Sequence, residues 1–400
     1  MPVVPPGEIR FHVRRTAGKG TQMPAERFVE ERHQTQHKIE AMGRYFGAWC
    51  FILARAKGVP FCTSRLWLID THAGRGLHLS EGDPDGVVPG TPVLAVLAAR
   101  NAQLQFPGVT VRVRATDIAK ATAIELDAYV RRYRGKPPTG VDVRVGADDW
   151  VKFVAKITTE ILEDSDHPHN GGRYGGGAHD HRSLWFVDPY GVEGIDHGVI
   201  EGLPRGSEVI VNLDLMGLLR DAARAENGEQ PLADLLDRAF GGPSWRGAPV
   251  GADGRAYMIA AFEQSFARRY KHRNHRLLRP SGSQDRAMIH LADSDKAVPE
   301  FARAVQAGLE AGTVIARGKL TAQQRGAAVV QLHGMFGGVT LTAAEMRGAA
   351  GLSISQVRVA CKAAEDRRYG RWDAASGTME WFAERAPELT LWDSAGGGQP

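Results

Sequence analysis

The chain has 400 residues, enough for two or three domains at roughly 100–200 residues each. Apolar residues make up 43% of it, but no run approaches the about 18 consecutive apolar residues that a membrane-spanning helix needs, and the N-terminus lacks the apolar stretch of a secretory signal. Three scattered cysteines exclude a disulfide framework or a zinc site, and the formal net charge is only +4. These features predict a soluble cytoplasmic protein with no membrane association and no bound metal.

In chain order, a tail and one long helix come first. Residues 1–22 are rich in Pro, Gly and Arg and are expected to form a flexible tail. From Pro24 to Ala56 the apolar residues are spaced for one face of a helix.

Strands and helices then alternate. The expected strands are Leu66–Asp70, Val109–Asp117, Val141–Val145, Ser183–Asp188, Glu208–Leu213 and Met288–Ala292. The expected helices are Thr91–Arg100, Lys120–Arg132, Trp150–Leu162, Leu232–Phe240 and Tyr257–Tyr270. Such alternation predicts an α/β domain over residues 23–318, with a mostly parallel sheet covered on both faces. In such a sheet the ligand lies beyond the C-terminal ends of the strands.

One glycine-rich segment, residues 166–182, interrupts this alternation, so no ordered element is expected there. Its four histidines also allow a metal-site interpretation: His167, His169, His179 and His181. A glycine loop provides no preorganised ligand geometry, so the segment is predicted to be a flexible, solvated surface loop.

After Lys319 the pattern changes to three helices and a hairpin. The expected helices are Thr321–His333, Thr342–Ala350 and Ser353–Arg368, followed by the short strands YGRW and TMEWF. This order is typical of a winged-helix module, here residues 319–400 with a short flexible tail. In that fold the third helix enters the major groove, here with Gln356, Arg358, Lys362 and Arg367. Many such modules instead bind protein or form a homodimer, so these uses stay open.

Positive charge is concentrated in two segments. Residues 313–372 carry nine Lys or Arg against three acids, and residues 267–280 carry six Lys or Arg and no acid. Phosphate backbones attract such charge, although basic runs are more often plain solvated faces. The candidate nucleic-acid contacts are Arg268, Arg269, Lys271, Arg273, Arg358 and Lys362.

Four motifs with chemical potential end four successive strands. The first is Asp70-Thr71-His72-Ala73-Gly74-Arg75-Gly76, whose small residues let a ligand approach the backbone. A dinucleotide site is not indicated, because the third glycine and the acid about 20 residues on are absent. The second motif is Asp117, which can accept hydrogen bonds from both hydroxyls of a ribose or can cap the next helix.

The third motif contains Asp148 and Asp149, either of which can accept a hydrogen bond from an adenine amino group or cap a helix. The fourth is Asp188-Pro189-Tyr190-Gly191, which is either a tight turn or a site for methylating an exocyclic amine. In the second interpretation, oxygen atoms accept the amine hydrogens and the aromatic ring stacks on a planar base. The four motifs together are more specific than any one alone.

In this order the motifs resemble those of the class I S-adenosylmethionine-dependent methyltransferases. The sequence DTHAGRG is similar to the first motif of the large-subunit ribosomal RNA adenine-N6 methyltransferases. Over roughly residues 33–310 the chain looks more like the three-Cys-motif partner protein family. The features shared with that family are Thr35-Gln36-His37-Lys38, the D-x-x-A-G-x-G turn at Asp70–Gly76, Gly90-Thr91-Pro92 and Phe186–Gly191.

This resemblance implies a Rossmann-like class I methyltransferase domain that binds S-adenosylmethionine, a C-terminal winged-helix-like module and a radical-type partner protein. It places Lys38 at the carboxylate end of the cofactor, Asp117 at its ribose and Asp148 or Asp149 at its adenine. The first-motif turn would also contact the cofactor, through Asp70, Thr71, His72, Ala73, Gly74 and Gly76. The methyl acceptor would face Asp188, Pro189 and Tyr190.

Three functions follow from these observations. The first is N-methylation of a nucleic-acid base at an adenine-type exocyclic amine. The second is an accessory, non-catalytic nucleic-acid-binding role beside a partner enzyme, since the fourth motif is D-P-Y-G and not D-P-P-[YF]. The third is methylation of a small molecule, although in such enzymes a winged module usually precedes the catalytic domain and here it follows.

Overall fold

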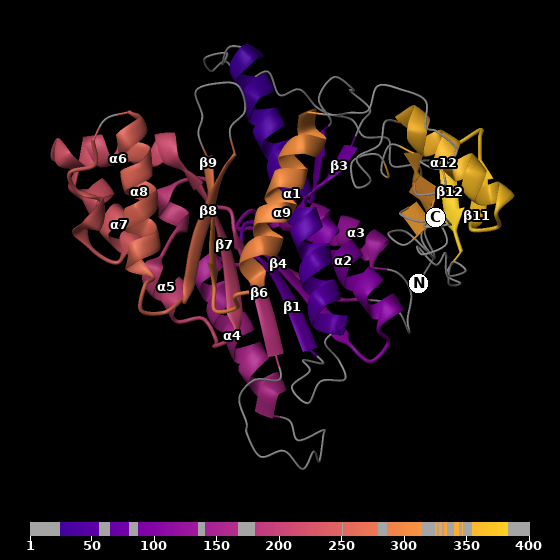
Figure 1. The fold of residues 1–400 in the computed structure, drawn as a ribbon, viewed down its shortest axis with the longest axis horizontal. Helices are drawn as coiled ribbons and strands as arrows, with labels where there is room; N and C mark the ends of the chain where they lie inside the picture. Colours follow the sequence, from indigo (N-terminus) through magenta and orange to yellow (C-terminus); the bar gives the residue numbers. More distant parts are fainter. Residues whose placement is uncertain are drawn as a thin grey trace, which may run out of the picture.

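The computed structural model describes residues 25–55, 65–79, 87–134, 141–166, 181–249, 251–278, 286–313 and 354–382, with scattered residues between 325 and 346. A seven-stranded sheet forms the centre, in the order β5-β4-β1-β6-β7-β9-β8 (Figure 1). Its strands are β1 (Arg65–Asp70), β4 (Thr110–Thr116), β5 (Asp142–Gly146), β6 (His181–Val187), β7 (Ser207–Asp214), β8 (His272–Leu278) and β9 (Arg286–Ala292). A small separate hairpin consists of β2 (Leu77–Leu79) and β3 (Val87–Pro89).

The sheet is mostly parallel. Strands β1, β4, β5, β6 and β7 run in one direction, and β9 pairs antiparallel with both β7 and β8. Chain order reverses between β1 and β6, which places the topological switch point beyond Asp70 and Val187, where doubly wound sheets bind ligands. The predicted α/β fold with a mostly parallel sheet is therefore confirmed.

Helices cover both faces of the sheet because the strand side chains alternate between two cores. On β1, Leu66 and Leu68 face one core, while Trp67 and Ile69 face the other. The first core is covered by α1 (Ala25–Arg55), α2 (Thr91–Gln105), α3 (Lys120–Tyr133) and α9 (Ala297–Thr313). The second is covered by α4 (Trp150–Asp166), α5 (His197–Glu201), α6 (Leu215–Glu226), α7 (Gln230–Phe240) and α8 (Ala252–Ser265).

A buried arginine connects strands β4 and β5 to helix α4. Arg114 of β4 is 1% exposed and pairs with Glu160 of α4 at 2.6 Å and Asp142 of β5 at 2.9 Å. Its guanidinium also lies over the Trp67 ring, 5.1 Å from the centroid. These contacts satisfy a charge that would otherwise be costly to bury.

Most predicted elements are present, with one clear error. The helix expected over Tyr257–Tyr270 begins earlier, at Ala252, and ends at Ser265, and the basic segment after it forms strand β8. Helices α6 and α9 were not predicted. The loop predicted at residues 166–182 is shorter than expected, because Asp166 belongs to α4 and residues 181–182 belong to β6. The rest of that segment lies outside the described residues.

Within the described residues, the C-terminal part contains one complete helix and three short strands. Helix α12 (Ile354–Asp366) precedes β11 (Gly370–Asp373) and β12 (Thr378–Trp381), which form the expected hairpin. Strand β10 (Thr340–Thr342) pairs with β12. The first two expected helices fall largely outside the described residues, so the winged-helix module and its boundary stay predictions. Among the described residues, no helix is long and apolar enough to cross a membrane.

Candidate functional site

The first motif forms a turn held by neighbouring strands. The backbone N–H of Thr71 donates to the Phe186 carbonyl at 3.0 Å, and that of Ala73 donates to the Thr116 carbonyl at 2.9 Å. The His72 N–H donates to Asp70 Oδ1 at 3.1 Å. Because these bonds reach β6 and β4 on either side of β1, the turn is fixed at the switch point of the sheet.

Two glycines in this turn have left-handed backbone conformations, with φ of 59° at Gly74 and 76° at Gly76. A Cβ at Gly76 would lie 2.5 Å from Leu126 Cδ1, whereas a Cβ at Gly74 would meet no atom within 4 Å. Gly76 is therefore needed for packing, while Gly74 borders open space. The structure thus leaves room for a ligand beside Gly74.

Asp117 joins the second motif to the first. Its Oδ2 accepts from the Gly74 N–H at 3.1 Å and its Oδ1 accepts from the Ala119 N–H at 2.9 Å. The side chain is only half-buried, so each oxygen keeps a further lone pair for a ligand. The next residue, Ile118, is 76% exposed and was not predicted from the sequence; it presents an apolar surface at the same strand end.

The two acids of the third motif have different environments. Asp149 is exposed and its Oδ1 accepts from the Val151 N–H at 3.0 Å, as a cap of α4 does. Asp148 is tied to the end of β4, because its N–H donates to Thr116 Oγ1 at 3.1 Å. Both lie at the same edge of the sheet as Asp117.

The fourth motif is joined to the N-terminal helix. The ammonium of Lys38 in α1 forms an ion pair with Asp188 Oδ2, and the two side chains are 11% and 14% exposed. Asn212 of β7 donates from Nδ2 to Asp188 Oδ1 at 2.7 Å. Lys38, expected near the cofactor carboxylate, thus contacts the expected acceptor-site carboxylate, and Asn212 is a further site residue that the sequence did not indicate.

Burial and charge set the ionisation of this cluster. Burial raises the pKa of the Asp70 carboxyl to about 7, against the hydrogen bond that Thr91 Oγ1 donates to Oδ2 at 2.5 Å. Burial also acts to raise the pKa of Asp188, but the Lys38 ammonium and the Asn212 amide outweigh it and hold that pKa below its usual range. Asp188 is therefore an ionised carboxylate at neutral pH.

His72 faces the fourth motif. Its Nδ1 lies 2.8 Å from Thr71 Oγ1, and its Nε2 would lie 3.0 Å from a Cβ at Gly194. Burial lowers the pKa of His72 against the pull of the Asp188 carboxylate, so the ring is neutral at neutral pH. The ring centroid lies 5.7 Å from that of Trp150.

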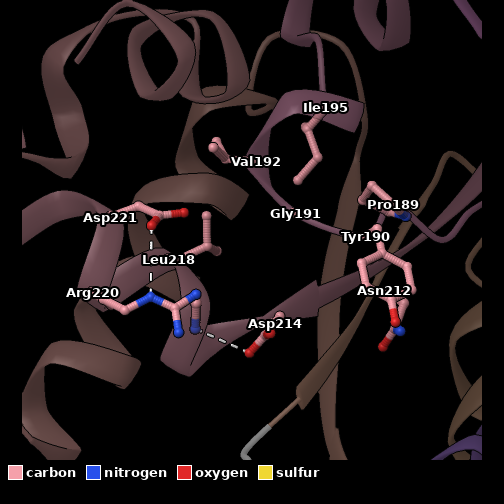
Figure 2. Close-up of a pocket in the computed structure, with 11 residues that line it drawn as sticks. Pro189, Tyr190, Gly191, Val192, Ile195, Asn212, Asp214, Leu218, Arg220 and Asp221 are labelled. Carbon is pink, nitrogen blue, oxygen red and sulfur yellow. Dashed lines mark hydrogen bonds and ion pairs between the residues drawn. The ribbon is translucent and has the colours of Figure 1, made fainter. Parts of the chain in front are cut away.

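A hollow opens beside the fourth motif, between its turn and the start of α6 (Figure 2). Pro189 is buried in its wall, whereas Tyr190 is fully exposed. The described lining residues are Pro189, Tyr190, Gly191, Val192, Ile195, Asn212, Asp214, Gly217, Leu218, Arg220 and Asp221. In Figure 2 the Arg220 guanidinium lies between the carboxylates of Asp221 and Asp214. A fully exposed aromatic ring beside a polar hollow is an arrangement that can stack on a flat ligand.

The candidate basic contacts lie in two separate places. Arg269 is 15% exposed and donates to the carbonyls of Leu203 and Pro204 at 3.2 and 3.1 Å, so it holds the fold together. Lys271 Nζ pairs with Asp295 at 2.8 Å, and Arg273 donates to the Tyr270 carbonyl at 2.6 Å. Arg268 is exposed at the end of the helix–turn region.

On α12, Arg358 and Lys362 are exposed and lie on one helical face. Gln356 is 3% exposed, so the expectation that it enters a DNA groove is wrong: it faces the core of the C-terminal unit. Arg367 is exposed just after α12, in the turn that leads to β11. Within the described part of the chain, no group of three or more His, Cys, Asp or Glu side chains is arranged to hold a metal ion. His167, His169 and His179 fall outside that part.

Comparisons with known proteins give distant likenesses only. No family model and no curated protein matches the chain. Three similar solved structures are protein LPL1258 of Legionella pneumophila, of family model DUF519, human methyltransferase-like protein 13 in complex with SAH, and Trm1 from Pyrococcus horikoshii with S-adenosyl-L-methionine.

The TM-scores of these three are 0.37, 0.30 and 0.31, at 13%, 12% and 11% identity. The matches cover 68%, 69% and 65% of this chain and 91%, 92% and 57% of the other chains. At such values the likenesses carry no conclusion about function, which must come from the residues of the site.

Proposed function

We propose that this protein is an S-adenosylmethionine-dependent methyltransferase that methylates the exocyclic amine of a nucleic-acid base. The observation that carries the proposal is the meeting of all four motifs at the switch-point edge of the sheet. Gly74 hydrogen-bonds to Asp117, Thr71 to the end of β6, and Asp188 to Lys38 and Asn212.

The residues present fit the nucleoside part of the cofactor. Asp117 retains acceptor capacity for the two ribose hydroxyls, and Ile118 offers an apolar surface for the adenine ring. Open space beside Gly74 leaves the turn accessible. The bound cofactor would supply an electrophilic methyl group on its sulfonium.

The acceptor side of the site would orient the amine. With the cofactor bound, the nitrogen would accept its methyl group as the C–S bond breaks, S-adenosylhomocysteine would leave, and the nitrogen would release one proton to solvent. An ionised Asp188 beside the reacting nitrogen would stabilise the positive charge that develops there. Tyr190, exposed at the mouth of the hollow, would stack on the base.

One observation favours a second candidate, the accessory role without catalysis. Lys38 neutralises the Asp188 carboxylate, and the motif has Tyr190 where an amino-methyltransferase has a second proline. In that case the protein would bind nucleic acid beside a partner enzyme. Membership of the three-Cys-motif partner family, a radical-type partner and a homodimer formed through the C-terminal unit belong to this proposal.

The first experiment is calorimetric titration of the protein with S-adenosylmethionine and S-adenosylhomocysteine. Asp117→Ala should lose micromolar binding, whereas Asp127→Ala, a matched control at an exposed α3 site paired with Arg131, should keep it. Absence of binding to well-folded wild type contradicts the enzyme proposal and favours the accessory role.

Catalysis is tested separately with Asp188→Asn. We expect this variant to bind S-adenosylhomocysteine as wild type does, and to lose radiolabelled methyl transfer to total cellular RNA or denatured DNA. Loss of cofactor binding in the same variant would refute the assignment of Asp188 to the acceptor side.

A further inference from the structure

Asn212 has an amide whose orientation is determined by its neighbour. The side chain is 1% exposed, and Nδ2 lies 2.7 Å from Asp188 Oδ1. An ionised carboxylate only accepts hydrogen bonds, so the amide must turn its NH₂ group toward Asp188 and its oxygen away. The positions of N and O in this amide are therefore assigned by chemistry.

The Asn212 oxygen is left without a partner. Oδ1 is buried and accepts no hydrogen bond from the described residues. A buried acceptor without a donor destabilises the fold, because it has lost its hydrogen bonds to water. The single hydrogen bond to Asp188 offsets only part of that cost. An asparagine at this position therefore adds little to the stability of the protein without a ligand.

The same residue borders the candidate acceptor site. Asn212 lines the hollow together with Pro189 and Tyr190 (Figure 2). Each oxygen of Asp188 already receives one donor, from Lys38 or from Asn212. An incoming NH₂ group brings two more donors, and Asn212 Oδ1 is the acceptor beside Asp188 that has none.

We propose that Asn212 recognises the methyl acceptor, with Oδ1 accepting one N–H of the exocyclic amine while Asp188 faces the other. This inference rests on the proposed function and deepens it by naming what the site selects. A base with an amino group would donate a hydrogen bond to Asn212 Oδ1, which has no other donor among the described residues. A base with a carbonyl at the same position would place its oxygen against Asn212 Oδ1, and because both atoms are acceptors, such a base would bind more weakly.

The test compares binding of two short single-stranded oligonucleotides that differ only at one base, adenine or purine, which lacks the amine. RNA and DNA versions are measured by fluorescence anisotropy, with and without saturating S-adenosylhomocysteine. Wild type should bind the adenine form about 10-fold more tightly, the ratio expected for one hydrogen bond to a buried acceptor. Asn212→Leu should bind both forms equally, and the control Asn101→Leu, at an exposed hydrogen bond of α2, should keep the preference.

Thermal unfolding separates this role from a structural one. Since Leu removes the orphan oxygen together with the bond to Asp188, Asn212→Leu should unfold within a few degrees of wild type. Asn212→Ala tests the same loss without added bulk. A preference retained by Asn212→Leu or Asn212→Ala overturns the proposal, as does wild type that binds the two oligonucleotides equally or binds neither. Failure to bind S-adenosylhomocysteine is read separately and contradicts the proposed enzyme function.

Discussion

Removing the cation of the Lys38–Asp188 pair, by Lys38→Met, should destabilise the protein in a pH-dependent way. The two side chains are 11% and 14% exposed, so the pair is largely shielded from water. Breaking a fully buried pair costs about 3–5 kcal/mol. Because this pair keeps some exposure, we expect about 2–3 kcal/mol at neutral pH, or a decrease in Tm of about 3–5 °C.

The sign of the pH dependence follows from Asp188. In wild type its pKa is held below the unfolded value, so the pair stabilises the fold above that value and the contribution is lost as pH falls. Without Lys38, burial raises the pKa of Asp188 in the folded state, while the Asn212 amide and Arg286 oppose the rise. The variant then loses stability as pH increases through the interval between the unfolded and the raised folded pKa.

The assay is thermal unfolding followed by circular dichroism at pH 5 and pH 7.5. The deficit of Lys38→Met should be larger at pH 7.5, and Lys38→Arg, which keeps the charge, should restore most of it. The double variant Lys38→Met/Asp188→Asn should also recover stability, since it leaves no buried charge. A deficit equal at both pH values would refute the argument and assign the effect to packing of the lysine stem.

Three further outcomes are expected. Gly76→Ala should lower the free energy of unfolding by about 2–4 kcal/mol in urea titration, because its Cβ would meet Leu126 Cδ1 at 2.5 Å in a left-handed conformation; an unchanged midpoint would contradict this. Arg114→Met should cost about 2–3 kcal/mol by the same measurement, since Glu160 then keeps only its pair with the exposed Arg144 at 3.1 Å, and no change would mean that Arg144 and solvent replace the lost pair. Ile118→Asn should weaken S-adenosylhomocysteine binding about 10-fold in calorimetry with Tm unchanged, and unaltered binding would remove Ile118 from the adenine surface.

Much of the fold could be predicted because its strands are buried on both faces. Runs such as Leu66–Asp70 and Glu208–Leu213 are almost continuously apolar, and each ends where the polar motif begins. Parallel strands place these ends at one edge, so the gathering of Asp70, Asp117 and Asp188 followed from the order of the strands alone.

Strand β8 was missed for the opposite reason. His272–Leu278 is an edge strand with mostly polar, half-buried residues, so its composition suggests a charged surface and not a strand. Just before this strand, Arg269 donates hydrogen bonds to the carbonyls of Leu203 and Pro204, which lie more than 60 positions away in the chain. No local pattern distinguishes such an arginine from one that is free to bind phosphate.

What the sequence by itself determined is the sheet, the edge at which its parallel strands end and the acids that follow those strands, because these follow from apolar periodicity and from the alternation of strands and helices. What only the tertiary structure decided is which partner each acid has. Lys38 and Asp188 are 150 positions apart and meet because α1 packs against α2 and α9, which brings Lys38 to the turn that follows β6. Asn212 is an ordinary polar residue near the end of a strand until β7 pairs with β6 and its amide is turned by Asp188. Ionisation and hydrogen bonding depend on distances and burial between such remote segments, and these exist only once the chain has folded.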